Sequence, residues 1–177
     1  KGTRMGEIGQ HLPKVLWPVF DKTLLELEVC YAKENFPKAQ IYINLYNYQK
    51  EIQDHIKSSS VFDGVKILVE EKVLDIGGAI HNLAKVVNYE GTLLTINSDQ
   101  FLIFEKQEFL KAEKLLIEND IVLFSYRVQS SSGYNALDLE GSSFKGVIKN
   151  SNVYEDKILT YTGMSLIKLA RLDRVVG

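Results

Sequence analysis

The sequence has 177 residues, which is enough for one well-packed domain. Its 21 lysines and arginines nearly balance 23 aspartates and glutamates, so the formal net charge of -2 gives no reason to expect nucleic acid or an anionic membrane as a partner. The single cysteine, Cys30, excludes an internal disulfide and a cysteine-built metal site within this sequence. No apolar run is long enough to span a membrane and no secretory leader is recognised, so we expect a cytoplasmic protein.

Helical and strand-like hydrophobic periods alternate along the chain. In chain order, the pattern predicts a helix over 23–35, a strand over 39–44, a helix over 48–57, a strand over 64–69, a helix over 78–87, a strand over 92–96, a helix over 106–118, a strand over 121–126, and short strands near 135–139 and 144–148. This alternation favours an α/β fold with a mostly parallel central sheet flanked by helices. The later short strands would form a small antiparallel extension.

The apolar strand TLLTI, over 92–96, is expected to be central in that sheet and covered on both faces. Ligands of such sheets bind where the strands end and the following loops open into a crevice. The N-terminal loop, the turn before Gly78 and the exit of the TLLTI strand are therefore the places where a site is expected.

The N-terminal run GTRMGEIGQHLPKVLWPV combines glycines with two cations. Gly2, Gly6 and Gly9 would let the backbone approach a polyphosphate and present its N–H groups. Arg4 and Lys14 would stabilise negative charge on phosphates. Taken alone, a glycine-rich loop with a lysine is more often only a flexible surface turn.

Two further segments carry polar groups at expected strand or helix ends. Gly77 and Gly78 would begin a helix and expose free N–H groups, with Asp75 beside them, although a simple capped helix start would show the same pattern. Asp99 follows the TLLTI strand, where a carboxylate is well placed to hold Mg²⁺ against phosphates. A polar turn after a buried strand is the alternative there.

The N-terminal run resembles the opening of the sugar-phosphate nucleotidyltransferases, whose pattern is Gly-x-Gly-Thr-Arg followed by a loop and Pro-Lys. Gly2, Thr3, Arg4, Pro13 and Lys14 match that pattern in kind and in spacing. The resemblance extends over nearly the whole chain and implies a Rossmann-like nucleotide-diphospho-sugar transferase fold. We expect a single domain over 1–177 that lacks the family's first strand and its C-terminal segment.

The resemblance also implies roles for individual residues. Arg4 and Lys14 would be catalytic through their contacts with phosphates, and Asp99 in Asn-Ser-Asp would be catalytic as the ligand of Mg²⁺. The implied nucleotide-binding residues are Gly2, Thr3, Asn44, Asp75, Gly77 and Gly78. The implied sugar-binding residues are Tyr134, Asn135, Lys149, Thr162 and Gly163.

The resemblance implies an enzyme that couples a sugar 1-phosphate to a nucleoside triphosphate and releases pyrophosphate. The short length and the segment LDIGGAI most resemble mannose-1-phosphate guanylyltransferase-like and N-acetylmuramate-1-phosphate uridylyltransferase-like members. The expected partners are therefore these small molecules, with GTP and mannose 1-phosphate as the leading pair and Mg²⁺ as cofactor. Nucleic acid and membrane are not expected partners.

Three alternatives compete with this hypothesis. A non-catalytic sugar-nucleotide-binding or regulatory relative is suggested by Ile76 and Ile148, which replace polar family residues, and by the lack of a recognisable second metal-binding aspartate. A cytidylyltransferase is suggested by the run Arg-Met-Gly after Thr3 but disfavoured by the long loop before Pro13. A glycosyltransferase of related fold would need an Asp-x-Asp motif, which Asn97 interrupts.

Overall fold

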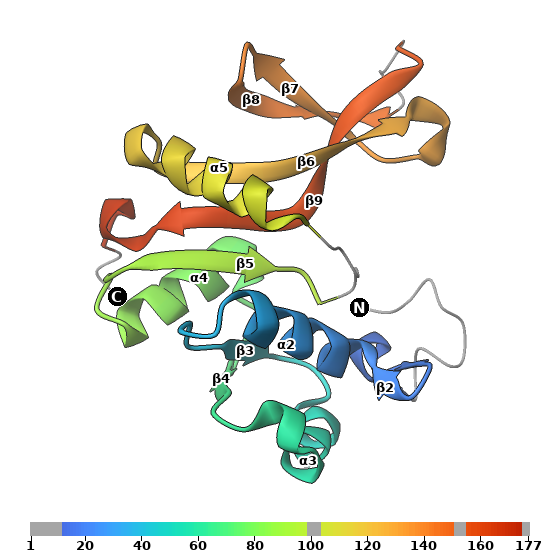
Figure 1. Ribbon diagram of the computed structural model, residues 1–177, viewed down its shortest axis with the longest axis vertical. Helices are drawn as coiled ribbons and strands as arrows, with labels where there is room; N and C mark the ends of the chain where they lie inside the picture. Colours follow the sequence, from blue (N-terminus) through green and yellow to red (C-terminus); the bar gives the residue numbers. More distant parts are fainter. Residues whose placement is uncertain (1–11, 99–103, 151–154, 175–177) are drawn as a thin grey trace. The chain divides into compact units, whose positions relative to one another are not determined.

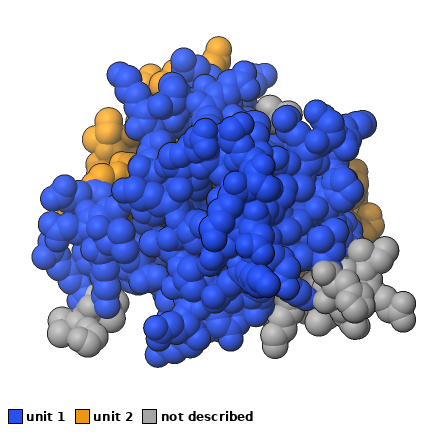
Figure 2. Space-filling model, turned by 90° about the horizontal axis from the view of Figure 1, so that it is seen from below, with its two compact units in different colours: residues 1–90, 98–106, 172–177 blue, residues 91–97, 107–171 orange. Residues whose placement is uncertain are grey.

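The computed structural model describes residues 12–98, 104–150 and 155–174. The chain divides into two units, which are distinguished by colour in Figure 2. Unit 1 comprises residues 1–90, 98–106 and 172–177, and unit 2 comprises residues 91–97 and 107–171.

Unit 1 begins with a short turn and a hairpin and continues with alternating helices and strands. Its elements are the 3₁₀ turn η2 (Lys14–Leu16), strands β1 (Pro18–Val19) and β2 (Lys22–Thr23), helix α2 (Leu24–Asn35), strand β3 (Tyr42–Leu45), helix α3 (Gln49–Ser58), the 3₁₀ turn η3 (Ser60–Phe62), strand β4 (Lys66–Val69) and helix α4 (Asp75–Val86). Helix α2 starts after Thr23 because Thr23 and Glu26 form a reciprocal capping box.

The centre of unit 1 is the parallel pair β3 and β4, joined by a crossover through α3 (Figure 1). The strands pair in register from Tyr42 opposite Lys66 to Leu45 opposite Val69. Helix α3 buries Ile52 and Ile56, which lie four residues apart on one face. The core of the unit is formed by Leu25, Val29, Ile43, Leu45, Ile52, Ile56 and Phe62. Both strands therefore end at the same edge, directly before the loops that lead into α3 and α4.

Unit 2 contains an antiparallel sheet, a helix and a hairpin. Its elements are strand β5 (Thr92–Ile96), helix α5 (Lys106–Glu118, whose first residue is assigned to unit 1), strand β6 (Ile121–Gln129), the 3₁₀ turn η4 (Ser130–Ser132), strands β7 (Ala136–Glu140), β8 (Ser143–Ile148) and β9 (Lys157–Lys168), and the 3₁₀ turn η6 (Leu169–Arg171). Strand β9 runs between β5 and β6 and is antiparallel to both (Figure 1). Helix α5 packs on this sheet through Phe109, whose ring lies 5.3 Å from that of Phe124 on β6.

Most predicted elements are confirmed, with boundaries shifted by up to three residues. The α/β class and the antiparallel extension, formed by β7 and β8, are also confirmed. The expected central position of the TLLTI strand is wrong within unit 2, because β9 is the middle strand there and β5 pairs with one side of it.

The sequence pattern missed most of β9 because Thr160, Thr162 and Ser165 interrupt its apolar run, although all three are buried. Among the strands that the structure describes, β3 and β4 form the one parallel pair. A single domain over the whole chain stays a prediction. None of the helices in the described ranges combines the length and apolarity needed to cross a bilayer.

Candidate functional site

The predicted site residues fall into three groups. Gly2, Thr3, Arg4 and Asp99 lie outside the described residues. Lys14, Asn44, Asp75, Gly77 and Gly78 lie in unit 1, and Tyr134, Asn135, Lys149, Thr162 and Gly163 lie in unit 2. The predicted nucleotide-binding residues that are described therefore share one unit, and the predicted sugar-binding residues share the other.

Lys14 is the first residue of η2, directly after the buried Pro13. The carbonyl of Pro13 accepts a hydrogen bond from the backbone N–H of Leu16 at 2.8 Å, and that of Lys14 accepts one from Trp17 at 3.0 Å. The indole N–H of Trp17 donates to the carbonyl of Leu12 at 3.2 Å. The Pro-Lys pair of the predicted motif is thus folded into a turn that leads into the β1–β2 hairpin.

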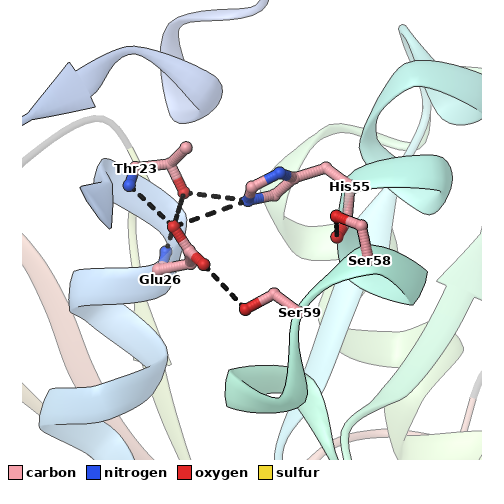
Figure 3. A network of polar contacts seen from close by, with 5 residues as sticks. All are labelled: Thr23, Glu26, His55, Ser58 and Ser59. Carbon is pink, nitrogen blue, oxygen red and sulfur yellow. Dashed lines mark hydrogen bonds and ion pairs between the residues drawn. The ribbon is translucent and has the colours of Figure 1, made fainter. Parts of the chain in front are cut away.

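The end of that hairpin is tied to α3 by a polar network, drawn in Figure 3. The hydroxyl of Thr23 lies 3.0 Å from Nε2 of His55, and the hydroxyl of Ser59 donates to Oε1 of Glu26 at 2.8 Å. The backbone N–H of Thr23 donates to Oε2 of Glu26 at 2.8 Å. These contacts join the start of α2 to the end of α3.

The same contacts act on the carboxyl group of Glu26. The hydrogen bond from the backbone of Thr23 is the largest cause that lowers its pKa, and burial opposes it. The hydroxyls of Ser59 and Thr23 and the nearby His55 lower the pKa further. A Ser/Thr-His-acid cluster of this kind resembles a nucleophilic triad. Here, however, the carboxylate of Glu26 and the hydroxyl of Thr23 both contact Nε2 of His55. In a triad, the acid and the hydroxyl contact opposite nitrogens of the ring, so this cluster is a helix cap and not a triad.

A second network in unit 1 joins the carboxyl ends of β3 and β4. Glu70 follows β4 and is buried, with 5% of the residue exposed. Its Oε1 accepts a hydrogen bond from Nδ2 of Asn44 at 2.7 Å, and its Oε2 accepts one from the backbone N–H of Leu74 at 3.3 Å. Asn44 and the start of α4, both predicted to bind nucleotide, are therefore linked through a residue that the sequence analysis did not select.

The start of α4 has an unusual backbone. Asp75 has φ of +55°, in the left-handed region that a non-glycine residue rarely adopts. A Cβ added at Gly78 would lie 2.7 Å from Cβ of Leu74, so this position needs glycine. Asp75 and Gly77 are exposed, and the first N–H groups of a helix have no partner within the helix. The segment from Asp75 to Gly78 can therefore offer N–H donors to an anion or a nucleobase.

In unit 2, Asn150 brings Tyr134, Asn135 and Lys149 together. Nδ2 of Asn150 donates to the carbonyl of Ser130 at 2.7 Å and to that of Tyr134 at 3.0 Å. The backbone N–H of Asn150, next to the exposed Lys149, donates to Oδ1 of Asn135 at 3.0 Å. Three of the five predicted sugar-binding residues thus lie around one asparagine at the end of the β7–β8 hairpin.

Tyr134 also contacts the sheet of unit 2. The residue is 47% exposed, and its ring lies edge-on to that of Tyr126, with 6.5 Å between centroids. Burial, followed by the neighbouring Tyr134, raises the pKa of the Tyr126 hydroxyl. The exposed face of Tyr134 is available to a ligand.

Thr162 and Gly163 are placed differently from the other predicted sugar-binding residues. Thr162 is 1% exposed, and its hydroxyl donates to the carbonyl of Phe124 at 2.9 Å and accepts from the backbone N–H of Met164 at 3.2 Å. Both hydrogen bonds of this hydroxyl are therefore made with backbone groups. Phe124 lies at the register shift between Leu123 and Ser125 in the pairing of β6 with β9. A sugar contact through it would require those bonds to break.

Gly163 lies against the exit of β5. It has φ of +84°, and a Cβ there would lie 2.9 Å from Cβ and from Nδ2 of Asn97. Its carbonyl accepts a hydrogen bond from the backbone N–H of Asn97 at 3.0 Å. Gly163 therefore fixes the position of Asn97, which precedes Asp99 by two residues in the sequence.

Glu70 and Asn150 are the residues that the sequence analysis missed. Each comes directly or soon after a strand, at the place where strand-end loops are expected to carry function. An acid immediately after the apolar run ILV, over 67–69, was the available signal for Glu70. Within the three described ranges, no group of three or more histidine, cysteine, aspartate or glutamate residues could hold a metal ion.

The known proteins that resemble this chain include a sugar 1-phosphate guanylyltransferase. No protein-family model matches the chain. The chain is 33% identical over 100 residues to the D-glycero-alpha-D-manno-heptose 1-phosphate guanylyltransferase of Campylobacter jejuni, a match of 56% of this chain and 44% of that protein. It is 26% identical over 160 residues to the bifunctional protein GlmU of a Synechococcus species, a match of 89% of this chain and 34% of that protein. The chain thus spans less than half the length of these curated relatives.

Solved structures with the same fold cover most of the chain. HddC from Yersinia pseudotuberculosis, also solved in complex with GMP-PN, has a TM-score of 0.75 at 18% identity and covers 89% of this chain and 68% of its own. A UDP-glucose pyrophosphorylase in complex with UDP-glucose has a TM-score of 0.72 at 17% identity and covers 94% of this chain and 72% of its own. The Rossmann-like fold expected from the sequence and the family resemblance that implied it are both confirmed.

Proposed function

This chain is a relative of the sugar-phosphate nucleotidyltransferases, and we propose that it catalyses the coupling of a sugar 1-phosphate to a nucleoside triphosphate. A phosphate oxygen of the sugar 1-phosphate forms a bond to the α-phosphorus of the triphosphate. The bond from that phosphorus to the oxygen bridging to the β-phosphate breaks, and pyrophosphate leaves. The products are a nucleoside-diphosphate sugar and pyrophosphate.

The observation that carries the proposal is the network of Asn44, Glu70 and Leu74. It joins the exits of two parallel strands to the N-terminus of α4, the place where open α/β sheets bind their ligands. Free N–H groups at the start of a helix suit the phosphates or base of a nucleotide. The cluster of Tyr134, Asn135 and Lys149 offers an aromatic face, an amide and a cation, which suit a sugar phosphate.

The chain's own cations would supply most of the catalysis. Phosphoryl and nucleotidyl transfer need positioning and charge stabilisation more than acid–base chemistry. Arg4 and Lys14 would bind the phosphates and stabilise charge on them. Asp99 would hold Mg²⁺, which when bound neutralises charge on the phosphate oxygens.

For the substrates we propose GTP and a manno-configured sugar 1-phosphate. The support is the guanylyltransferase from Campylobacter jejuni, whose sugar has the D-manno configuration, together with the HddC structure that contains GMP-PN. Mannose 1-phosphate and a manno-heptose 1-phosphate are both consistent with this support. We place the enzyme in the cytoplasm, where nucleoside triphosphates are available.

The test is pyrophosphate release by the protein across a grid of four nucleoside triphosphates and several sugar 1-phosphates. We expect release to require both substrates and to be fastest with GTP and a manno-configured sugar. Fastest release with UTP or dTTP would contradict the substrate assignment but keep the reaction. Binding of a sugar nucleotide without turnover of any pair would favour a non-catalytic, regulatory relative.

A further inference from the structure

The carboxyl group of Glu70 is buried and is satisfied by N–H donors from two different elements. Asn44 on β3 donates to one oxygen at 2.7 Å, and the backbone of Leu74, before α4, donates to the other at 3.3 Å. Burying a carboxyl group costs free energy unless such donors replace water. The arrangement therefore joins β3 to the start of α4 through a single side chain.

The backbone of Glu70 is itself held in place. Its N–H donates to the carbonyl of Leu45 at 2.8 Å, which extends the pairing of β3 with β4 by one residue. Its carbonyl accepts from Nε2 of Gln49 at 3.1 Å, and that amide also donates to the carbonyl of Tyr46 at 2.9 Å. The side chain of Glu70 therefore projects from a fixed point between β3 and α3.

The start of α4 needs an acceptor from outside the helix. Leu74 occupies the N-cap position, where its side chain can accept no hydrogen bond. Glu70 accepts from the backbone N–H of the N-cap residue Leu74 itself, as the glutamate of a capping box does, and places an acidic group near the positive end of the helix. The left-handed backbone of Asp75 follows, a conformation that costs about 1–2 kcal/mol and persists where neighbours hold it.

We propose that Glu70 is a positioning residue for nucleotide binding. Through Leu74 it holds the segment from Asp75 to Gly78 in one conformation, and Asn44 acts by orienting Glu70 rather than by touching the nucleotide. The link to nucleotide rests on the function proposed above, whereas the effect on the segment does not.

The role of Glu70 is tested by swapping the hydrogen-bond donor at position 44 with the acceptor at position 70. In Asn44→Asp, the new carboxyl group faces that of Glu70 at close range and repels it. In the double variant Asn44→Asp with Glu70→Gln, the introduced amide can donate to the introduced carboxylate, and its oxygen can still accept from Leu74. Glu71→Gln, the same change at an exposed neighbour, is the matched control.

Two measurements are made on each variant: hydrogen–deuterium exchange of the peptide covering 70–78, and the KM and kcat for GTP with mannose 1-phosphate. For Asn44→Asp we expect exchange about tenfold faster and a GTP KM about tenfold higher, with kcat changed less, because a hydrogen bond to a charged group is lost. For the double variant we expect both values within about twofold of wild type, and no change for Glu71→Gln.

Unchanged exchange in Asn44→Asp, or exchange that the second substitution does not restore, would overturn the role of Glu70. The double variant could also regain the wild-type rate of hydrogen–deuterium exchange but keep a raised KM for GTP. That result would show that Asn44 contacts the nucleotide directly, which contradicts the assigned role of Asn44. If the wild-type protein turned over no substrate pair, the proposed function would fail. The exchange data would still decide whether Glu70 holds the segment.

Discussion

Gly163 and Asn97 approach each other so closely that a side chain at position 163 would collide with that of Asn97. The nearest atoms of Asn97 would lie 2.9 Å from an added Cβ, and the carbonyl of Gly163 accepts the backbone N–H of Asn97 at 3.0 Å. Real Cβ atoms essentially never lie that close to another heavy atom, so the chain at position 163 or at Asn97 must shift to admit a side chain. This contact fixes the backbone at Asn97, directly after β5.

Gly163→Ala is therefore expected to be damaging for two reasons. The left-handed φ of +84° costs an alanine about 1–2 kcal/mol, and the contact with Asn97 adds to that cost. We expect a loss of stability to chemical denaturation of about 2–4 kcal/mol and a fall in kcat, because Asp99 follows closely. Gly64→Ala is the matched control, since Gly64 has φ of +78° with nothing within 4 Å. Equal losses in the two variants would show that the contact with Asn97 has no energetic weight.

The network around Glu26 makes the free energy of unfolding depend on pH. Its lowered pKa means that the folded state favours the ionised carboxylate, so the stabilisation is complete above the ordinary glutamate value of 4.5 and is lost as the pH falls through the lower folded-state pKa. Glu26→Gln should cost about 1–3 kcal/mol of unfolding free energy at pH 7, and the difference from wild type should shrink as the pH falls below the ordinary value of 4.5.

Urea denaturation at a series of pH values measures the effect of Glu26. Glu34→Gln, on the exposed side of the same helix, is the control and should follow wild type throughout. A difference between wild type and Glu26→Gln that stays constant throughout the acid range would contradict the assigned contacts with Thr23, His55 and Ser59.

Asn150→Ala should weaken sugar-phosphate binding without affecting the nucleotide. The substitution removes two hydrogen bonds to the backbone carbonyls of Ser130 and Tyr134 and loosens the loop that carries Tyr134 and Asn135. We expect the KM for the sugar 1-phosphate to rise about tenfold while the KM for GTP stays within about twofold. Asn119→Ala is the control, because the Asn119 amide donates to Leu115 at the end of α5. A rise in the GTP KM of the same size would argue against a separate sugar site in unit 2.

The proposed catalytic residues are distinguished by their response to metal. Lys14→Ala should lower kcat by about 10²-fold at every Mg²⁺ concentration, because a fixed cation near the phosphates is lost. Asp99→Ala should lower activity by at least as much and raise the Mg²⁺ concentration required for half-maximal rate. Removal of divalent cations with EDTA should abolish wild-type turnover reversibly. Full turnover in both variants would show that the site is elsewhere, even if the family is right.

Local pattern was enough to predict the helices and most strands. The helical periodicity over 23–35 and the spacing of Ile52 and Ile56 are local signals, and the structure places α2 and α3 where they indicate. Strand β9 was largely missed because Thr162 and Ser165 are polar yet buried, their hydroxyls bonded to partners far away in the sequence. No local pattern reports such partners.

The candidate site was predictable to a similar extent. Tyr134, Asn135 and Lys149 were selected through family resemblance, and the structure brings them together around Asn150. Glu70 was not selected, because its importance comes from a hydrogen bond to Asn44, which is 26 residues earlier in the sequence. The parallel pairing of β3 with β4 creates that contact, and pairing of distant strands is what a single sequence specifies least directly.

The proposed reaction is tested most directly by its stoichiometry with GTP, a manno-configured sugar 1-phosphate and Mg²⁺. Pyrophosphate and the nucleoside-diphosphate sugar are quantified in the same mixture, by an enzyme-coupled assay and by ion-exchange chromatography. We expect one pyrophosphate for each nucleoside-diphosphate sugar, with neither product formed when one substrate is omitted. Release of inorganic phosphate without a sugar nucleotide, or no product from this or any other substrate pair, would contradict it.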